Sequence, residues 1–137
     1  MGTLVGTMVD RVAFTVEQGK VLELARATGA TSADHTEGGL ATATHVVVAG
    51  HHRDQQGFVA ALGLDIRRIV VGSVSWEYAR PLRVGDELVG TRTVVGDETR
   101  EGRSGTNRLV TLETAWTDPD GAVLVRQREV LVERGAS

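Results

Sequence analysis

One stretch of the sequence decides the fold that we expect, namely Trp76-Glu77-Tyr78-Ala79-Arg80-Pro81-Leu82-Arg83-Val84-Gly85-Asp86-Glu87-Leu88. Alternation of side-chain character up to Tyr78 predicts a β-strand. Pro81 has no backbone N–H and cannot continue a central ladder, so the strand is expected to end before it. Gly85-Asp86 is typical of a turn, and a second strand is expected after it.

Further strands are expected on both sides of this stretch. Upstream, the alternation begins at Ile66, and five residues are expected to share one strand face: Val70, Gly72, Val74, Trp76 and Tyr78. Downstream, β-rich segments predict strands over 88–95, 109–116 and 123–132. A polar hairpin loop over 96–106 and the turn Asp118-Pro119-Asp120-Gly121 separate these segments. The four strands together predict an antiparallel meander.

Helices are expected before the meander, after a short extended start. Thr15 has the side chain of a helix N-cap and Gln18 follows at the capping-box spacing, which predicts a helix over 16–28 that ends at Gly29. Residues 29–39 have the composition of a loop. The segment 40–62 is apolar at first and then polar, and its length favours a buried helix that emerges towards solvent. Helices that precede an antiparallel sheet indicate the α+β class.

Size and composition restrict the function. A chain of 137 residues with 41% hydrophobic and 24% charged residues is expected to form one globular domain, 1–137. The net charge of −3 and the scattered basic residues argue against nucleic acid as a partner. No apolar run has the length of a membrane span, and the N-terminus lacks a signal-peptide pattern, so no membrane association and a cytoplasmic location are expected. The absence of cysteine excludes disulfides and thiolate metal sites.

The opening stretch resembles the strand-Arg-Pro-x-x-x-Gly-Asp-x-Leu segment of the MaoC-like acyl dehydratases, especially their FAS1-like branch. Leu40-Ala41-Thr42-Ala43-Thr44 is similar to the start of the family's central helix, and the segment from Asp118 to Glu129 is similar to its last hairpin. The resemblance covers about residues 10–134. It implies a single hot-dog domain, in which an antiparallel sheet wraps around a central helix.

The resemblance also implies a substrate and a partner. Members of the family act on acyl thioesters of coenzyme A or acyl carrier protein, so coenzyme A or phosphopantetheine is expected as part of the substrate and no separate cofactor is expected. A homodimer is expected, with a heterodimer containing a second hot-dog subunit as the alternative; in both, two sheets join into one. The thioester carbonyl is expected near the start of the central helix, where backbone N–H groups can polarise it.

The catalytic loop of the family departs from its pattern in this chain. The dehydratases carry Asp and His in a Ser/Thr-Gly-Asp-x-Asn-Pro-x-His loop, and the corresponding stretch here runs from Thr28 to His35. The Thr-Gly start and His35 match the loop, but Ala30 stands where the catalytic aspartate belongs and Ser32-Ala33 replaces Asn-Pro. An unmodified Asp–His mechanism is therefore not expected from this chain alone.

Histidines are the strongest remaining catalytic candidates. His35 can act as acid or base near neutral pH, and Asp34 and Glu37 are nearby carboxylates. His45 falls in the first turns of the expected central helix, near the proposed thioester. An exposed loop position for His35 and a packed, hydrogen-bonded position for His45 are the structural alternatives.

Other residues are expected to bind substrate or to lie at the surface. Four are candidates for substrate binding: Thr44, Trp76, Tyr78 and Arg80. A core position for Trp76 and a solvated salt bridge for Arg80 are the plainer alternatives. His51 and His52 are expected at the surface or an interface, and no metal is expected, because the histidine spacing matches no standard zinc motif.

Three functions fit these observations. The first is conjugate addition to, or elimination from, an enoyl or 3-substituted acyl thioester, with water or an amine such as an amino acid as the nucleophile and Arg80 as the partner of the amino acid's carboxylate. The second is a thioesterase that uses Asp34 or Glu37 to activate water. The third is a non-catalytic subunit of a heterodimeric dehydratase, which the replacement by Ala30 favours.

Overall fold

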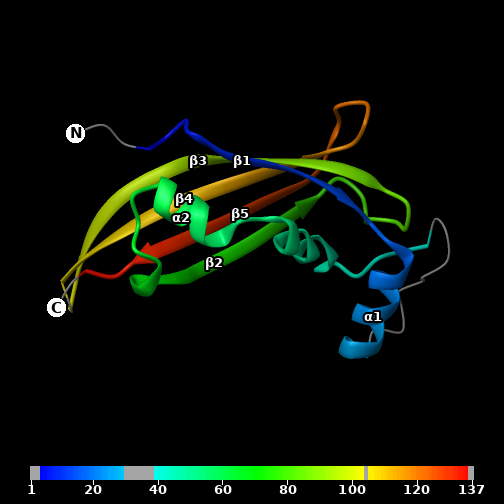
Figure 1. Ribbon diagram of the computed structural model, residues 1–137, viewed down its shortest axis with the longest axis horizontal. Coiled ribbons are helices and arrows are strands. Elements are labelled where there is room, and N and C mark those ends of the chain that lie inside the picture. Colours follow the sequence, from blue (N-terminus) through cyan, green and yellow to red (C-terminus); the bar gives the residue numbers. More distant parts are fainter. Residues whose placement is uncertain (1–3, 30–38, 104, 136–137) are drawn as a thin grey trace.

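Five antiparallel strands form one curved sheet in the order β1-β3-β4-β5-β2, and helices cover one of its faces (Figure 1). The computed structural model describes residues 4–29, 39–103 and 105–135. The strands are β1 Met8–Thr15, β2 Ile69–Tyr78, β3 Glu87–Gly102, β4 Gly105–Thr117 and β5 Val123–Glu133. The helices are α1 Gln18–Thr28, the 3-10 helix η1 His45–His52, α2 Gln55–Ala61 and the 3-10 helix η2 Ile66–Arg68. This arrangement confirms the α+β class.

The meander contains three strands rather than the expected four. Strands β3, β4 and β5 follow one another in the sheet, but β2 pairs with β5 and not with β3, so the chain crosses the sheet between Tyr78 and Glu87. The strand ends before Pro81 as predicted, and Gly85 has the positive φ of 98° that favours glycine in a turn. The proline and the turn therefore belong to a crossing connection, not to a hairpin.

The hairpin between β3 and β4 is longer than the sequence suggests. The segment 96–106 was expected to be a loop because it is polar and contains glycine, but β3 continues to Gly102 and β4 begins at Gly105. Gly96 lies at a register shift and pairs with Thr111. Polar composition marks this part of the hairpin as solvent-exposed, and the backbone ladder continues through it.

A bulge in β2 divides the strand face that was predicted to be continuous. The register moves from Val71 opposite Leu131 to Ser73 opposite Val130, so Gly72 is the extra residue. Directly opposite residues share a face, and Leu131 is a core residue, so Val71 lies on the covered face. Beyond the bulge, the residues on the covered face are the even-numbered ones: Val74, Trp76 and Tyr78. The prediction was right for these three residues and wrong for Val70 and Gly72.

The first helix begins later than its capping pattern predicts. Thr15 is the last residue of β1, and Glu17 occupies the N-cap position without a side-chain hydrogen bond to the helix. The predicted cap at Thr15 is therefore wrong, because strand pairing with Glu87 holds that residue in the sheet. The end of the helix is confirmed, since Gly29 adopts a left-handed conformation with a φ of 66°.

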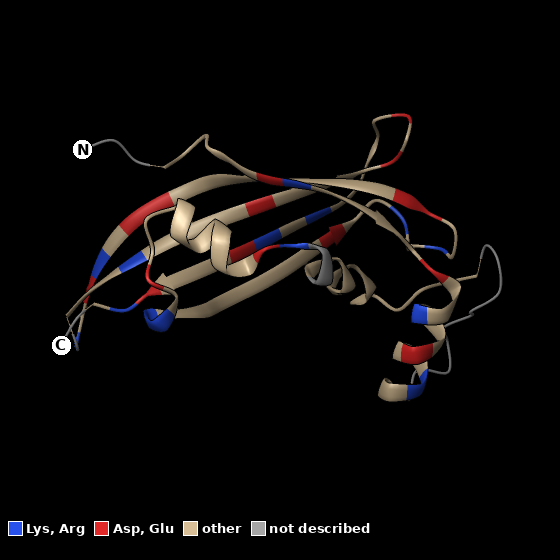
Figure 2. Cartoon of the chain, in the orientation of Figure 1, with Lys and Arg blue, Asp and Glu red and all other residues tan. Residues whose placement is uncertain are grey.

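The expected central helix is divided into η1 and α2. Arg53 has extended backbone angles (φ −110°, ψ 144°) and separates the two helices. Asp54 then caps α2, because its Oδ1 accepts a hydrogen bond of 2.9 Å from the backbone N–H of Gly57. Figure 2 shows that η1 and α2 carry almost no charge along their described lengths, whereas the joint between them carries both signs.

Two hydrophobic cores lie between these helices and the sheet. Helix η1 contributes Val46 and Ala49 to the first core, which centres on Trp116; helix α2 contributes Phe58 and Val59 to the second. The other buried residues of the first core are Phe14, Val16, Val21, Leu82, Val84, Leu88, Leu124 and Val125. Those of the second core are Leu62, Leu64, Val94, Val110, Leu112 and Leu131.

A row of polar groups crosses the covered face of the sheet between the two cores. The strand register places Asp10, Arg92, Thr114, Gln127 and Trp76 opposite one another in turn, one from each strand. We call these five residues the polar row, with Trp76 included for its indole N–H. Arg92 and Thr114 are each only 1% exposed. Buried polar groups of this kind need partners on the sheet or from the helices above it.

The close approach of Trp116 to Gly90 gives a first prediction. A Cβ atom at position 90 would lie 2.5 Å from Cζ3 of the buried Trp116 ring. We expect Gly90→Ala to destabilise the protein by about 1–3 kcal/mol, because the indole has no room to move in its core. Gly19→Ala is the matched control: it lies in α1 with no atom within 4 Å of the added Cβ, so its stability should be unchanged or slightly higher. Equal urea midpoints for the two variants would contradict this packing.

Candidate functional site

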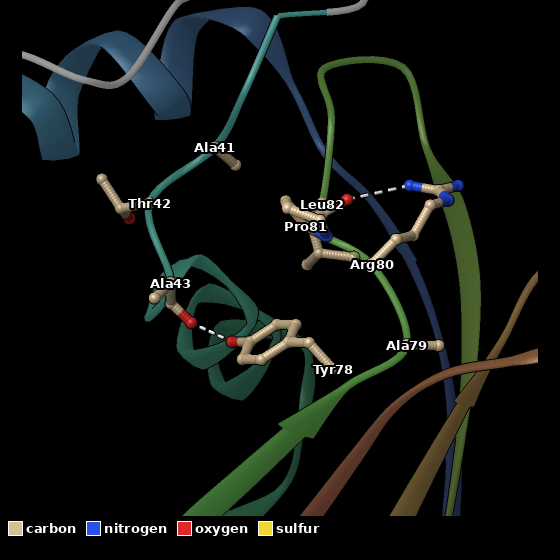
Figure 3. A pocket seen from close by; sticks show the side chains of 8 residues that line it. All are labelled: Ala41, Thr42, Ala43, Tyr78, Ala79, Arg80, Pro81 and Leu82. Carbon is tan, nitrogen blue, oxygen red and sulfur yellow. Dashed lines mark hydrogen bonds between the residues drawn. The ribbon is translucent and has the colours of Figure 1, made fainter.

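A cavity of about 340 Å³ lies between the segment that precedes η1 and the segment that follows β2. It is lined by Ala41, Thr42, Ala43, Tyr78, Ala79, Arg80, Pro81 and Leu82 (Figure 3). The Tyr78 hydroxyl donates a hydrogen bond to the carbonyl oxygen of Ala43 and so ties the two walls together. Burial raises the pKa of Tyr78, which keeps the phenol protonated as a donor. The walls are otherwise small and mostly apolar.

Arg80 lines this cavity but is committed to an ion pair. Its two terminal nitrogens donate to the two carboxylate oxygens of Asp86 at 2.9 and 3.0 Å, and Asp86 also accepts from the backbone N–H of Arg83 at 2.8 Å. Hydrogen bonding to Asp86 raises the pKa of Arg80. Arg80 therefore stabilises the turn that forms one wall of the cavity. Of the two expectations for Arg80, substrate binding and a salt bridge, the structure shows the salt bridge.

Thr42, which the sequence reasoning missed, also lines the cavity. Its Oγ1 atom is buried and has no hydrogen-bond partner in the described part of the chain. Figure 3 shows its side chain turned away from Pro81 and Leu82. The predicted residue Thr44 instead occupies the N-cap position of η1 without a side-chain cap, is exposed, and does not line the cavity.

The start of η1 adjoins the cavity, but two of its backbone donors are already used. The N–H groups of His45 and Val47 donate to the carbonyl oxygens of Thr42 and Thr44 at 3.1 and 3.0 Å. Neither N–H group is therefore free to polarise a thioester carbonyl in this conformation. The start of η1 therefore lies beside the cavity, but these two N–H groups do not donate into it.

His45 lies in the first core and not in the cavity wall. Its side chain is fully buried, and its ring centroid is 5.8 Å from that of Phe14. Neither ring nitrogen has a hydrogen-bond partner among the described residues. His45 is therefore packed, as the structural alternative expected, but it lacks the hydrogen bonds which that alternative also expected. Burial lowers the pKa of His45, and the nearby charge of Glu17 opposes this shift in part. His45 is thus held as a neutral imidazole away from the cavity surface.

The remaining sequence-predicted residues are distributed as follows. His35, Asp34, Ala30 and Glu37 lie outside the described residues, so their proposed roles stay predictions. Trp76 contributes to a second cavity. No group of three or more His, Cys, Asp or Glu side chains that could hold a metal ion occurs among the described residues. Within the same described ranges, no helix is long and apolar enough to cross a membrane.

The second cavity, of about 240 Å³, follows the first along η1 and β2. It is lined by Val46, Val47, Gly50, Arg53, Gln55, Val74, Trp76, Arg92, Gln127 and Glu129. Its floor includes part of the polar row, and its wall includes the joint between η1 and α2. We refer to the two cavities together as the groove between η1 and β2: the first is lined by small, mostly apolar residues, and the second is lined also by charged and amide groups.

Ion pairs neutralise the charges beneath this second cavity. The Arg92 Nε donates to Asp10 at 3.1 Å, and its Nη1 donates to Glu129 at 3.2 Å. The guanidinium of Arg92 also lies 3.9 Å from the ring centroid of Phe58 in α2. These contacts satisfy a cation whose side chain is only 2% exposed.

Arg53 reaches down from the joint to the same charges. Its side chain is 5% exposed, its Nη2 lies 3.5 Å from Thr114 Oγ1, and its guanidinium lies 5.2 Å from the ring centroid of Trp116. Burial and the charge of Arg92 lower the pKa of Arg53, and Asp10 and Glu129 oppose this shift. An arginine nevertheless stays protonated in a protein. Two cations and two carboxylates therefore share this part of the molecule.

Comparisons with known proteins agree with this architecture. A family model described as FAS1-like, dehydratase domain region, matches residues 3–127. A UPF0336 protein from Clavibacter michiganensis subsp. michiganensis is 35% identical over 133 residues, which cover 89% of this chain and 87% of that relative.

Solved structures show the same fold. The crystal structure of a C-terminally truncated HadBC (3R-hydroxyacyl-ACP dehydratase) complex from Mycobacterium tuberculosis has a TM-score of 0.78 at 18% identity, over 96% of this chain and 98% of that chain. A MaoC-like dehydratase from Rhodospirillum rubrum has a TM-score of 0.64 at 20% identity, over 97% and 94% of the two chains. The predicted hot-dog fold is confirmed.

The burial of His45 predicts how stability depends on pH. The folded-state pKa is lower than the unfolded value of about 6.5, so the unfolded chain binds the proton more readily. The stability contributed by the neutral imidazole is complete above about pH 6.5 and is lost as the pH falls below it, by up to about 1.4 kcal/mol per pH unit. Urea unfolding between pH 7 and 5.5 should show this slope in the wild type.

Substitution of His45 isolates this effect from other titrations. His45→Gln should flatten the slope between pH 7 and 5.5, because the amide does not titrate there. His51→Gln and His52→Gln control for the neighbouring histidines and should retain it. An unchanged slope in His45→Gln would show that this imidazole is not the group responsible.

Proposed function

The chain belongs to the family of FAS1-like dehydratase domains, and on that premise we propose that it binds acyl thioesters for a hydratase/dehydratase-type reaction. The thioester is carried by coenzyme A or acyl carrier protein. The cavity between residues 41–43 and 78–82 receives its reactive end, beside the start of η1. The acyl chain then follows the groove between η1 and β2.

One observation supports a binding role for this chain in the reaction. Hydration of an enoyl thioester needs a base for the nucleophile and an acid for the α-carbon. Among the residues that the structure describes, those lining the first cavity include no carboxylate and no imidazole, and Arg80 is neutralised by Asp86. The sequence also has Ala30 where the family carries its catalytic aspartate. We therefore propose that this chain supplies the binding wall and that a second hot-dog subunit supplies the Asp–His pair.

The edge of the sheet supports such a dimer. Strand β2 pairs with β5 alone in the described sheet, so its outer backbone groups are available to another strand. Val71 and Val74, on the covered face of this edge strand, are 58% and 37% exposed. Burial of these valines against a second sheet would bring a partner subunit next to the groove, which β2 itself borders. A structural neighbour, HadBC, is named as a 3R-hydroxyacyl-ACP dehydratase complex.

The homodimer and the other reactions expected from the sequence give different experimental outcomes. A homodimer would have to use His35 from this chain, with or without Asp34. An amine nucleophile would give an amine adduct of the enoyl thioester, and a thioesterase would release free acid. No described contact favours either of these two reactions over hydration.

Activity measurements test the division of labour between the subunits. The purified chain is incubated with crotonyl and longer enoyl thioesters, alone and together with a hot-dog subunit that carries the complete Asp–His loop, with and without amino acids. We expect water adducts only from the mixed dimer. His35→Ala in this chain should leave that activity intact, whereas substitution of the partner's dyad should abolish it. Hydration by this chain alone, lost in His35→Ala, would contradict the proposal.

Filling the first cavity tests the binding role independently of turnover. Ala43 is exposed and lines the cavity, so Ala43→Leu should fold normally but weaken binding of a saturated acyl-coenzyme A about tenfold or more, or about 1.4 kcal/mol. Ala60→Leu is the matched control, because Ala60 is an exposed residue of α2 that lines neither cavity described above. Calorimetric titration that gives the same Kd for both variants would contradict this location.

A further inference from the structure

We infer that the second cavity selects acyl groups that carry a neutral oxygen acceptor, a keto or hydroxyl group, part-way along the chain. This inference rests on the proposed function and specifies its substrate. The cavity lies beyond the first along the groove, since Tyr78 lines the first, and Trp76 and Val74 line the second. Two residues along a strand span roughly 7 Å, so the selected oxygen lies several methylene groups beyond the reacting carbons.

Two residues that line this cavity, Arg53 and Trp76, each have a buried donor without an acceptor. The Nε of Arg53 and the Nε1 of Trp76 are inaccessible to solvent and make no hydrogen bond in the described part of the chain. The nearest carboxylate oxygen to Arg53 Nε, Oδ2 of Asp10, is 3.9 Å away, which is too long for a hydrogen bond. Both groups can donate only, so both are satisfied by an oxygen and neither by a hydrocarbon.

The distribution of existing partners shows why these two donors differ from their neighbours. The Nε1 of Trp116 donates to Gln127 at 3.3 Å, and Arg92 has both of its carboxylate partners. The polar row is therefore satisfied except at the end that faces η1 and the edge strand β2. Because both nitrogens are covered, an occupant reaches them only when the side chain of Trp76 or Arg53 turns towards the cavity.

Charge balance determines which acceptor fits. Arg53 and Arg92 are already matched by Asp10 and Glu129 around this cavity. A carboxylate on the acyl group would add an unmatched negative charge at a site removed from water, which is costly. A plain alkyl chain would leave the two donors without an acceptor. A keto or hydroxyl oxygen satisfies donors without changing the charge.

Competition binding tests this preference in the dimer that carries the thioester site. The probes are saturated acyl-coenzyme A thioesters of one length, which hydration does not consume, with a methylene, keto, hydroxyl or carboxylate group at the same mid-chain position. We expect the keto or hydroxyl probe at its best position to bind about tenfold more tightly than the alkyl probe. The carboxylate probe should bind most weakly.

Trp76→Phe isolates the indole donor, since it removes the N–H and keeps an aromatic ring. It should reduce the preference for the oxygenated probe to about threefold or less and leave the Kd of the alkyl probe unchanged. Ser75→Ala is the control, because Ser75 is exposed in the same strand and lines neither cavity described above, and it should keep the full preference.

The outcomes separate this inference from the function on which it rests. Tight binding of all probes without an oxygen preference, a preference for alkyl or carboxylate, or a preference that survives intact in Trp76→Phe would overturn the inference alone. Failure of every probe to bind would overturn the proposed function as well. Arg53→Met removes the second donor and should also lower the preference for the oxygenated probe. Its urea stability is measured alongside binding, so that the preference is evaluated for the folded fraction.

Discussion

The buried charge of Arg92 is the constraint on which the rest of the structure depends. A guanidinium buried on the covered face of a sheet is stable only when carboxylates and hydrogen-bond acceptors surround it. Asp10 and Glu129 meet this need from neighbouring positions on the covered face, and Phe58 packs over the cation. The polar row that results divides the interior into two cores. A continuous hydrophobic core, and one uninterrupted helix above it, are incompatible with this row.

The break in the central helix follows from the same constraint and produces the groove. Arg53 is extended where the helix would otherwise continue, and its side chain descends to Thr114 in the polar row. Helix η1 then covers the first core and α2 covers the second. The groove between η1 and β2 is apolar beside Tyr78 and polar beside Arg53. The packing of Arg53 onto the polar row therefore determines the character of both cavities. The proposed function depends on this difference between the two cavities and on the edge strand beside them.

Features of the fold that depend on local chemistry were predictable from the sequence, whereas the long-range strand pairing was not. Pro81, Gly85 and Gly29 act through their own backbone restrictions, and each ended or turned the chain where predicted. The place of β2 beside β5 and the bulge at Gly72 depend on residues 47 to 64 positions away, which no local pattern contains. The length of the segment 40–62 predicted a helix through Arg53, because the buried partners of Arg53 are known only once the sheet is formed. For the site, two of the substrate-binding candidates, Tyr78 and Arg80, line the first cavity. Thr42, which also lines it, was not a candidate, because its only signal is its position just before the helical segment.

The central claim is that this chain supplies a binding wall and its partner supplies the acid–base pair. A crystal structure of the mixed dimer with a saturated acyl-coenzyme A tests it most directly. We expect the thioester group between residues 41–43 and 78–82 of this chain, with a carboxylate–histidine pair of the other subunit within hydrogen-bond reach. A thioester bound outside this cavity, or bound here with His35 of the same chain as its acid–base group and no partner residue nearby, would contradict it.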